Sequence, residues 1–217
     1  MTAAPIRVLV VDDDSMAAAG MTAVLSTAPD LEVVGRCTDG DEIAAALATH
    51  AVDVVLCDVR MPRMDGVSAV AALRDRAAFL MMTAFDDEGA VLRAIDAGAS
   101  GFLLKDDDPR RILDAVRSVA AGDAEFSPRV ARQLAAWVRD DDRAVARRDA
   151  QAKVAMLTER ERELAIAVVA GASDAELAEA FFIAASTVKS TLNGIRVKWG
   201  IRTRTELAVI TVRAGLA

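Results

Sequence analysis

The chain has 217 residues, of which 53% are hydrophobic, and its formal net charge is −7. This length allows one large domain or two small ones, and the acidic balance argues against a protein that coats nucleic acid indiscriminately. One histidine and two distant cysteines exclude histidine-dependent triads, a disulfide framework and a zinc site. Because no window reaches the roughly 18 apolar residues of a membrane span and no secretory signal is present, we expect a cytoplasmic protein with no membrane partner.

Short apolar or β-branched runs alternate with helical patterns over the first 122 residues. The runs cover residues 6–11, 31–35, 54–57, 79–82 and 102–104, and the helical patterns cover residues 15–27, 41–49, 67–75, 88–97 and 109–121. Such alternation predicts right-handed crossovers and a parallel sheet covered on both faces. We therefore predict an α/β domain with a doubly wound, five-stranded parallel sheet.

Polar side chains follow four of these five predicted strands, at the edge of the sheet where ligands bind in open α/β folds. They are Asp12, Asp13 and Asp14 after the first strand, Asp58 after the third, Thr83 after the fourth and Lys105 after the fifth. The second predicted strand ends in Gly35 and Arg36, and no comparable group follows it.

These residue types are suited to phosphoryl chemistry. Asp12 and Asp13 beside Asp58 would crowd like charges unless a cation neutralised them, and an all-oxygen cluster suits Mg²⁺. Asp58 can then act as a nucleophile on a phosphoryl group, whose remaining oxygens Lys105 and Thr83 can hold. The alternative is that each residue is only a polar loop residue.

Four blocks, at residues 10–14, 57–66, 82–84 and 101–105, resemble the signature blocks of two-component receiver domains. The resemblance spans residues 5–122 and implies a flavodoxin-like receiver domain over residues 1–122, in which Asp58 accepts a phosphoryl group from a histidine kinase. The implied metal ligands are Asp12, Asp13, Asp58 and the backbone carbonyl of Arg60. The implied catalytic and switch residues are Thr83, Lys105 and Phe102, although Phe102 can equally be an ordinary core residue.

Residues 123–155 show a different pattern, which we interpret as a partly helical linker. Ser127 and Pro128 suit the start of a helix over residues 130–138. A mixed-charge stretch follows at residues 139–149, and the sequence leaves open whether it forms a solvated helix or a flexible tether.

The last 62 residues, 156–217, predict a small all-α domain of four helices. Two capping boxes, Thr158 with Glu161 and Ser173 with Glu176, indicate helix starts. The second helix covers residues 174–181, a turn follows at 182–185, and the third and fourth helices cover residues 186–199 and 205–214. Two short helices joined by a turn, the second of them within a stretch of five basic and no acidic residues at 186–205, indicate a helix-turn-helix.

The third of these helices has two faces. Val188, Leu192, Ile195 and Trp199 share one face and should pack inward, which leaves Lys189, Ser190, Asn193 and Lys198 free to meet DNA. The alternative is an ordinary solvated basic helix.

Blocks at residues 157–161, 175–178, 186–189 and 198–202 resemble the LuxR-type DNA-binding domain, and the whole chain resembles a NarL/FixJ-type response regulator. This resemblance implies that Lys189, Ser190 and Asn193 face bases, that Thr187 and Lys198 hold phosphates, and that the last helix helps the domain to dimerise. Two residues depart from the family pattern: Ala184 stands where a capping serine is common, and Trp199 stands where leucine is usual.

The resulting prediction is a transcription regulator that a cognate sensor histidine kinase phosphorylates with Mg²⁺, and that then binds promoter DNA as a homodimer. We expect no enzymatic activity beyond its own phosphoryl transfer and slow dephosphorylation. One alternative is a Mg²⁺-dependent phosphatase, but Arg60 occupies the place of the general acid that such an enzyme needs. Another is a regulator that works without phosphorylation.

Overall fold

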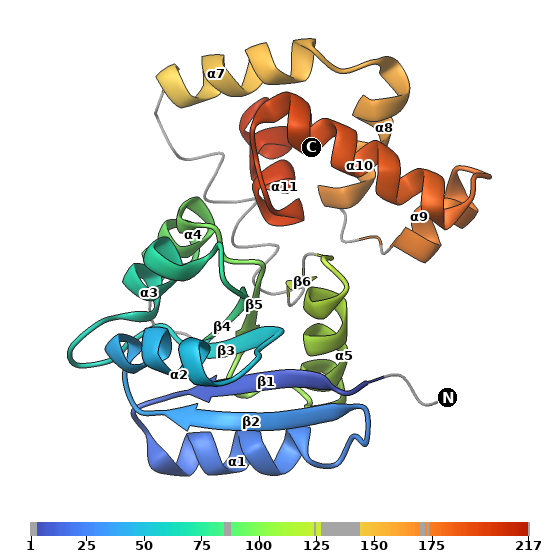
Figure 1. Ribbon diagram of the computed structural model, residues 1–217. Helices are drawn as coiled ribbons and strands as arrows, with labels where there is room; N and C mark the ends of the chain where they lie inside the picture. Colours follow the sequence, from blue (N-terminus) through green and yellow to red (C-terminus); the bar gives the residue numbers. More distant parts are fainter. Residues whose placement is uncertain are drawn as a thin grey trace. The chain divides into compact units, whose positions relative to one another are not determined.

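The computed structural model describes residues 4–84, 88–123, 125–126, 144–169, 172 and 174–216. The chain divides into two compact units, residues 1–127 and 128–217 (Figure 1). Each unit has its own hydrophobic core. Within the described ranges, no helix is long and apolar enough to cross a membrane.

The first unit is built on a parallel sheet with the strand order β2-β1-β3-β4-β5-β6. The strands are β1 (Ile6–Val11), β2 (Leu31–Cys37), β3 (Val54–Asp58), β4 (Ala78–Thr83), β5 (Gly101–Leu104) and β6 (Glu125–Phe126). The five predicted strands are confirmed, and β6 extends the sheet beside β5. The sequence analysis had placed β6 in the linker, because two residues are too few to show an alternating pattern.

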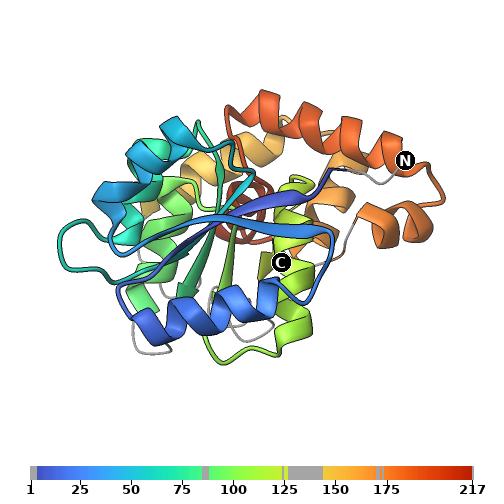
Figure 2. The same cartoon turned by 60° about the horizontal axis from the view of Figure 1, so that its bottom comes forward.

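Helices cover both faces of this sheet, as a doubly wound fold requires. They are α1 (Ser15–Leu25), α2 (Ile43–Thr49) after a 3-10 turn at Gly40–Glu42, α3 (Gly66–Leu73), α4 (Glu88–Ala97) and α5 (Pro109–Ala120). Figures 1 and 2 show α1 and α5 on one face and α2, α3 and α4 on the other. Val8 and Leu56 pack toward α1 and α5, and the alternate residues Leu9 and Val55 are fully buried as well. Burial on both faces explains why the strands are continuous apolar runs.

The second unit is helical throughout its described residues. Its helices are α7 (Ala144–Ala155), α8 (Glu159–Val169), α9 (Asp174–Ala180), α10 (Ala185–Trp199) and α11 (Arg204–Arg213). The last four are the predicted helices, and the capping box of Thr158 and Glu161 is present at the start of α8. The predicted helix at 130–138, the charged residues 139–143 and Ser173 lie outside the described residues.

Helix α7 occupies the end of the predicted linker, where the sequence left a helix and a tether open. It packs with the second unit: Val154 and, just after the helix, Leu157 join that unit's core. The indole N–H of Trp199 donates to the backbone carbonyl of Lys153 at 2.8 Å. Trp199, which replaces the usual leucine, therefore gives a hydrogen bond to a carbonyl in the last turn of α7, where helices leave carbonyls without intrahelical partners.

A buried ion pair joins the starts of α9 and α11. The Arg204 guanidinium donates to the Asp174 carboxylate and, at 2.6 Å, to the carbonyl oxygen of Ala172. Both side chains are almost fully enclosed, so removing either partner would leave an uncompensated buried charge. Arg204 therefore belongs to the interior of the domain, whereas the sequence analysis had counted it among the bases of the exposed basic stretch.

The loop between β3 and α3, residues 59–65, is fastened at both its base and its tip. At the base, the N–H of Val59 donates to the Met82 carbonyl at 3.1 Å, and the N–H of Gly66 donates to the Val59 carbonyl at 2.9 Å. At the tip, the Asp39 carboxylate accepts the N–H groups of Arg63 at 2.9 Å and Met64 at 2.8 Å. The segment after β2 and the loop after β3 are thereby held together.

Two further contacts of the segment around Asp39 tighten this fastening, which we call the Asp39 clamp. A Cβ on Gly40 would lie 2.4 Å from the carbonyl oxygen of Met64, so only glycine permits this approach. The Arg63 guanidinium also donates to Asp41 and Glu42, at 2.7 Å in each case. The second strand is thus followed by a carboxylate that holds the loop, and β2 runs two residues beyond its predicted end.

The buried Asp39 carboxylate should stabilise the first unit at neutral pH. Burial alone would raise its pKa, but the N–H groups of Arg63, Met64 and Asp41 and the charge of Arg63 together outweigh burial and hold the pKa below the ordinary value of 3.8. We expect Asp39→Ala to lower the melting temperature of the full chain by several degrees, because two partly buried N–H groups lose their acceptor. The melting temperature of Asp39→Asn should lie between those of the wild-type chain and Asp39→Ala, since the amide keeps one acceptor oxygen.

A carboxylate with a lowered pKa stabilises the fold above its unfolded-state value, and the stabilisation is lost as pH falls through the folded-state value. The difference between the wild-type chain and Asp39→Asn should therefore be complete at neutral pH and shrink below pH 3.8. Asp114→Asn, at an exposed carboxylate, serves as the control. Equal melting temperatures for the wild-type chain and Asp39→Ala would show that the clamp does not stabilise the fold.

Candidate functional site

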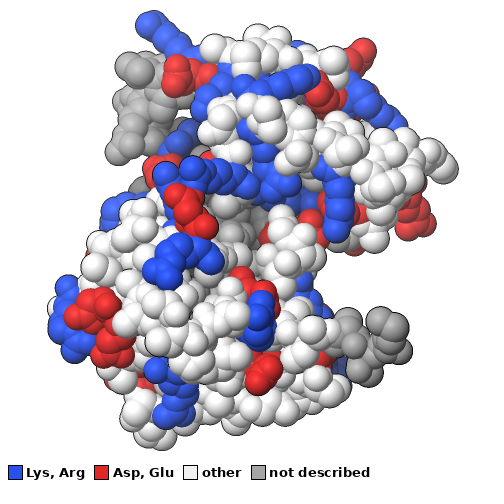
Figure 3. Space-filling view, in the orientation of Figure 1, with Lys and Arg blue, Asp and Glu red and all other residues white. Residues whose placement is uncertain are grey.

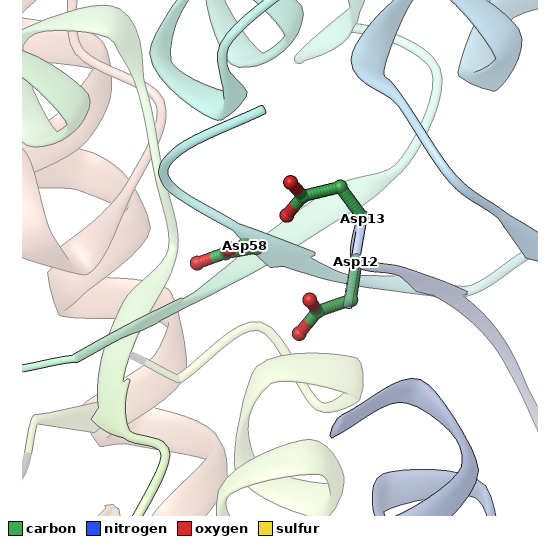
Figure 4. A group of neighbouring side chains, drawn as sticks. All are labelled: Asp12, Asp13 and Asp58. Atoms are coloured by element: carbon green, nitrogen blue, oxygen red, sulfur yellow. The ribbon is translucent and has the colours of Figure 1, made fainter. Parts of the chain in front are cut away.

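Three carboxylates converge at the carboxyl edge of the sheet. Asp12 and Asp13 follow β1, Asp58 ends β3, and one oxygen of each lies within 4.8 Å of the others. Figure 4 shows the Asp12 and Asp13 carboxylates pointing toward the side on which Asp58 lies. Asp12 and Asp58 are 1% and 7% exposed, whereas Asp13 is exposed. The cluster is therefore open to solvent on the Asp13 side.

Lys105 binds the two buried carboxylates of this cluster. Its Nζ lies 2.8 Å from Oδ2 of Asp12 and 3.0 Å from Oδ2 of Asp58. The other oxygens accept backbone N–H groups: Oδ1 of Asp12 from Asp14 at 3.0 Å, and Oδ1 of Asp58 from Val59 at 2.8 Å. Both acidic side chains are thus held in place from two directions.

The local charges determine how this site can act. Burial raises the pKa of Asp58, and the bonds from Lys105 only partly counter it. Burial alone would lower the pKa of Lys105, but its bonds to Asp12 and Asp58 raise that pKa above the ordinary value. At neutral pH Lys105 is therefore charged, and three carboxylates with one ammonium leave two negative charges. An all-oxygen donor set with this charge fits a divalent cation such as Mg²⁺.

The remaining predicted residues of the first unit lie on β4, on β5 and in the loop after β3, and their contacts differ. Thr83 ends β4 and is buried, and its hydroxyl donates to the carbonyl of Ala84 at 2.8 Å. Phe102 is fully buried in β5, where it pairs with Met81 of β4. Arg60 lies in the loop after β3 with its side chain exposed. Thr83 thus ends the strand that lies next to β3, the strand that Asp58 ends. Phe102 is a core residue in this conformation.

The predicted inward and outward faces of the third C-terminal helix are both found in α10. Val188, Leu192, Ile195 and Trp199 are buried. The predicted DNA contacts are all exposed: Thr187, Lys189, Ser190, Asn193 and Lys198. Figure 3 shows lysine and arginine side chains spread over the visible face of the second unit, with acidic side chains between them. As the sequence indicated, Ala184 occupies the N-cap position and offers no side-chain cap.

One of these exposed bases has a partner within the chain. Nζ of Lys198 lies 2.6 Å and 2.7 Å from the two carboxylate oxygens of Glu161. Burial alone would raise the pKa of Glu161, but Lys198 and Thr158 outweigh it and lower that pKa. Arg196 donates to the carbonyl of Arg202 at 3.2 Å. Some basic side chains of this stretch, such as Lys198 and Arg196, therefore bond within the chain, while Lys189 is exposed.

The sequence analysis missed the contacts that two acidic residues make: Asp39 with the loop that follows Asp58, and Glu161 with Lys198. Asp39 follows β2 by two positions, so a longer second strand would have revealed it. Glu161 was identified only as a capping residue, and its pairing with Lys198 is 37 positions distant in sequence. No sequence pattern predicts a contact of that separation.

Comparisons with known proteins agree with this geometry. Residues 8–117 match the family described as "Response regulator receiver domain", and residues 155–211 match "Bacterial regulatory proteins, luxR family". The chain is 34% identical over 214 residues to the response regulator protein VraR of Staphylococcus aureus, covering 97% of this chain and 98% of VraR. It is 32% identical over 214 residues to the transcriptional regulatory protein YxjL of Bacillus subtilis, covering 97% of each.

Solved structures are similar as well. The response regulator ChrA of a heme-sensing two-component system matches 99% of this chain and 100% of its own, with 31% identity and a TM-score of 0.56. The receiver domain of NarL from Mycobacterium tuberculosis matches 55% of this chain and 99% of its own, with 36% identity and a TM-score of 0.53. The chain therefore belongs to the two-component response regulators, in which a receiver domain precedes a LuxR-type DNA-binding domain and which act as transcription factors.

Proposed function

We propose that this response regulator is switched by phosphorylation of Asp58, which it accepts from a sensor histidine kinase, and that the phosphorylated chain binds promoter DNA as a homodimer. The observation that carries the proposal is the convergence of Asp12, Asp13 and Asp58, two of which, Asp12 and Asp58, pair with the ammonium of Lys105. The receiver domain would occupy residues 1–122 and the DNA-binding domain residues 156–217, as the motifs predict.

The chemistry follows from the positions of these groups. A carboxylate oxygen of Asp58 attacks phosphorus, the P–N bond of the kinase phosphohistidine breaks, and the imidazole leaves with the electron pair of that bond. Mg²⁺, held by Asp12, Asp13, Asp58 and the backbone carbonyl of Arg60, would supply charge neutralisation for the carboxylates and the phosphoryl oxygens. Oδ1 of Asp58 accepts the N–H of Val59 and Oδ2 faces the ammonium of Lys105. We expect Oδ2 to be the attacking atom, because the ammonium beside it can then pair with the phosphoryl oxygens.

Phosphorylation would change two contacts described above. Lys105 now bonds to Oδ2 of Asp58 at 3.0 Å, and a phosphoryl group on that oxygen would take over the ammonium. The Thr83 hydroxyl now donates to Ala84 and would turn toward a phosphoryl oxygen. These shifts alter the ends of β4 and β5, and with them the adjoining helical face. Phe102, buried in β5, would take part only by leaving its core position.

On the DNA side, α10 would act as the recognition helix. Lys189, Ser190 and Asn193 would face bases, while Thr187 and Lys198 would hold phosphates. A structure of two RcsB dimers bound to two parallel DNAs shares this fold at 18% identity, with a TM-score of 0.57 over 94% of this chain and 96% of its own. Helix α7 packs against α11, and most residues of α11 are buried. Dimerisation through α11 would therefore require a rearrangement of the helices that cover it.

The phosphoryl acceptor can be tested directly. After incubation with acetyl phosphate and Mg²⁺, the wild-type chain should give a retarded band on a Phos-tag gel, because Asp58 forms an aspartyl phosphate. Asp58→Asn should give none, and chelation of Mg²⁺ should suppress the wild-type band. Asp114→Asn, an exposed aspartate far along the sequence, should behave as wild type. An equal shift in Asp58→Asn and in the wild-type chain would contradict the assignment.

The ion pair between Lys198 and Glu161 predicts unequal roles for two lysines of α10. With a duplex that the wild-type chain selects from a random library, Lys189→Ala should weaken binding severalfold and reduce the salt dependence by about one counterion. Lys198→Ala should cost less, because its charge is already partly neutralised by Glu161.

Glu161→Gln keeps an acceptor for the capping box and removes the carboxylate charge, so it should strengthen binding of the same duplex. Fluorescence anisotropy over a series of salt concentrations measures all three variants. A loss for Lys198→Ala as large as that for Lys189→Ala would show that the ion pair with Glu161 does not weaken the phosphate contact proposed for Lys198.

A further inference from the structure

Phe182 combines two unusual properties. It lies in the turn between α9 and α10 (Figure 1), its side chain is 95% exposed, and its φ of 53° is the only positive value at a non-glycine residue in the described part of the chain. Left-handed backbone is unfavourable for a bulky side chain, and a fully exposed ring loses the benefit of burial. The packing of the second unit does not require an exposed aromatic side chain at this position.

The positive φ follows from the way in which α9 ends. The N–H of Phe182 donates to the carbonyl of Glu179 at 3.2 Å, and the N–H of Ile183 donates to the carbonyl of Ala178 at 3.0 Å. This pair of bonds forms a Schellman motif, in which the residue at the position of Phe182 is usually glycine. A glycine would form the same turn without strain, so the turn itself does not require a ring.

The neighbours of Phe182 show which side chains the turn does need. Phe181 and Ile183 both pack against the core of the second unit. The Arg160 guanidinium lies 4.5 Å from the centre of the Phe181 ring and donates to the Phe181 carbonyl at 2.7 Å. The turn is therefore anchored on both sides of Phe182, and the Phe182 ring projects outward from a firmly held backbone.

We propose that Phe182 is a DNA-contacting residue whose ring packs on an apolar face of the duplex, a deoxyribose or a thymine methyl group, beside the groove that α10 enters. This inference rests on the proposed DNA-binding role of α10. In a helix-turn-helix the first helix crosses the DNA backbone and the start of the second meets base edges, so the turn between them lies at the DNA surface. Phe182 precedes the N-cap of α10 by two residues, and the exposed Thr187 and Lys189 follow on that helix.

The chemistry of the ring suits this partner. Apolar side chains contact thymine methyl groups in the major groove, and an aromatic ring supplies a large contact area at a low cost in conformational entropy. Because Arg160 and the Schellman bonds already hold the turn, little backbone order would have to be gained on binding.

The test uses the full chain and two substitutions, Phe182→Gly and Phe182→Asn, which suit left-handed backbone and remove the ring. Both variants should melt at or above the wild-type temperature. Both should bind a duplex selected by the wild-type chain roughly tenfold more weakly, as expected for the loss of a buried ring contact. The salt dependence should stay unchanged, because no charge is removed. Met156→Ala, which removes another exposed apolar side chain of the same unit, should bind as wild type.

A duplex with deoxyuridine in place of thymidine distinguishes the two apolar faces. A loss of wild-type affinity to the level of Phe182→Gly assigns the contact to a thymine methyl group, and retained affinity assigns it to a deoxyribose. Wild-type affinity in both Phe182 variants would overturn the proposal, and so would a lower melting temperature in both, which would show that the ring stabilises the fold.

Tighter binding by the unphosphorylated variants with no loss in the phosphorylated ones would also overturn it, and would point to a contact of Phe182 with the receiver domain. A wild-type chain that selects no duplex at all would instead contradict the proposed function, and this outcome is visible before any variant is made.

Discussion

The ion pairs that Lys105 makes with Asp12 and Asp58 are the interaction on which the site depends. Three carboxylates within 4.8 Å of one another repel strongly when two of them are almost fully buried. A single ammonium at 2.8 Å and 3.0 Å makes this crowding tolerable and leaves two negative charges for a divalent cation. The same ammonium is the group that a new phosphoryl oxygen would attract. One contact thus stabilises the resting arrangement and, in the proposed function, would make it respond to phosphorylation.

The surroundings of these ion pairs hold the carboxyl edge of the sheet in place. Asp58 lies at the end of a fully buried strand, and the loop that follows it is fastened at its base by Val59 and Gly66 and at its tip by Asp39. Asp39 accepts backbone N–H groups of the loop, so it holds the path of the chain, and the Arg63 side chain adds bonds to Asp41 and Glu42. A site for phosphoryl transfer needs such positioning more than it needs further reactive groups.

Some basic side chains of the second unit form ion pairs within the domain, and others are exposed at its surface. Arg204 is buried against Asp174, Lys198 is paired with Glu161, and Lys189 remains exposed on α10. A count of basic residues therefore overstates the charge available to DNA. The exposed Phe182 ring suggests that apolar contact supplements this limited charge, which would suit a protein whose overall balance is acidic and which should avoid indiscriminate binding.

The sequence by itself determined the fold class, the positions of five strands and the residues at the strand ends, because hydrophobic periodicity and turn residues act over short distances. It also identified both faces of α10 from helical spacing alone. Only the tertiary structure decided what depends on contacts between distant segments: the two-residue strand β6, the Asp39 clamp, the docking of α7 through Trp199, and the internal partners of Arg204 and Lys198. These features arise where residues 21 to 46 positions apart meet. A local pattern carries no information about which distant partner a charged side chain or a backbone N–H will find.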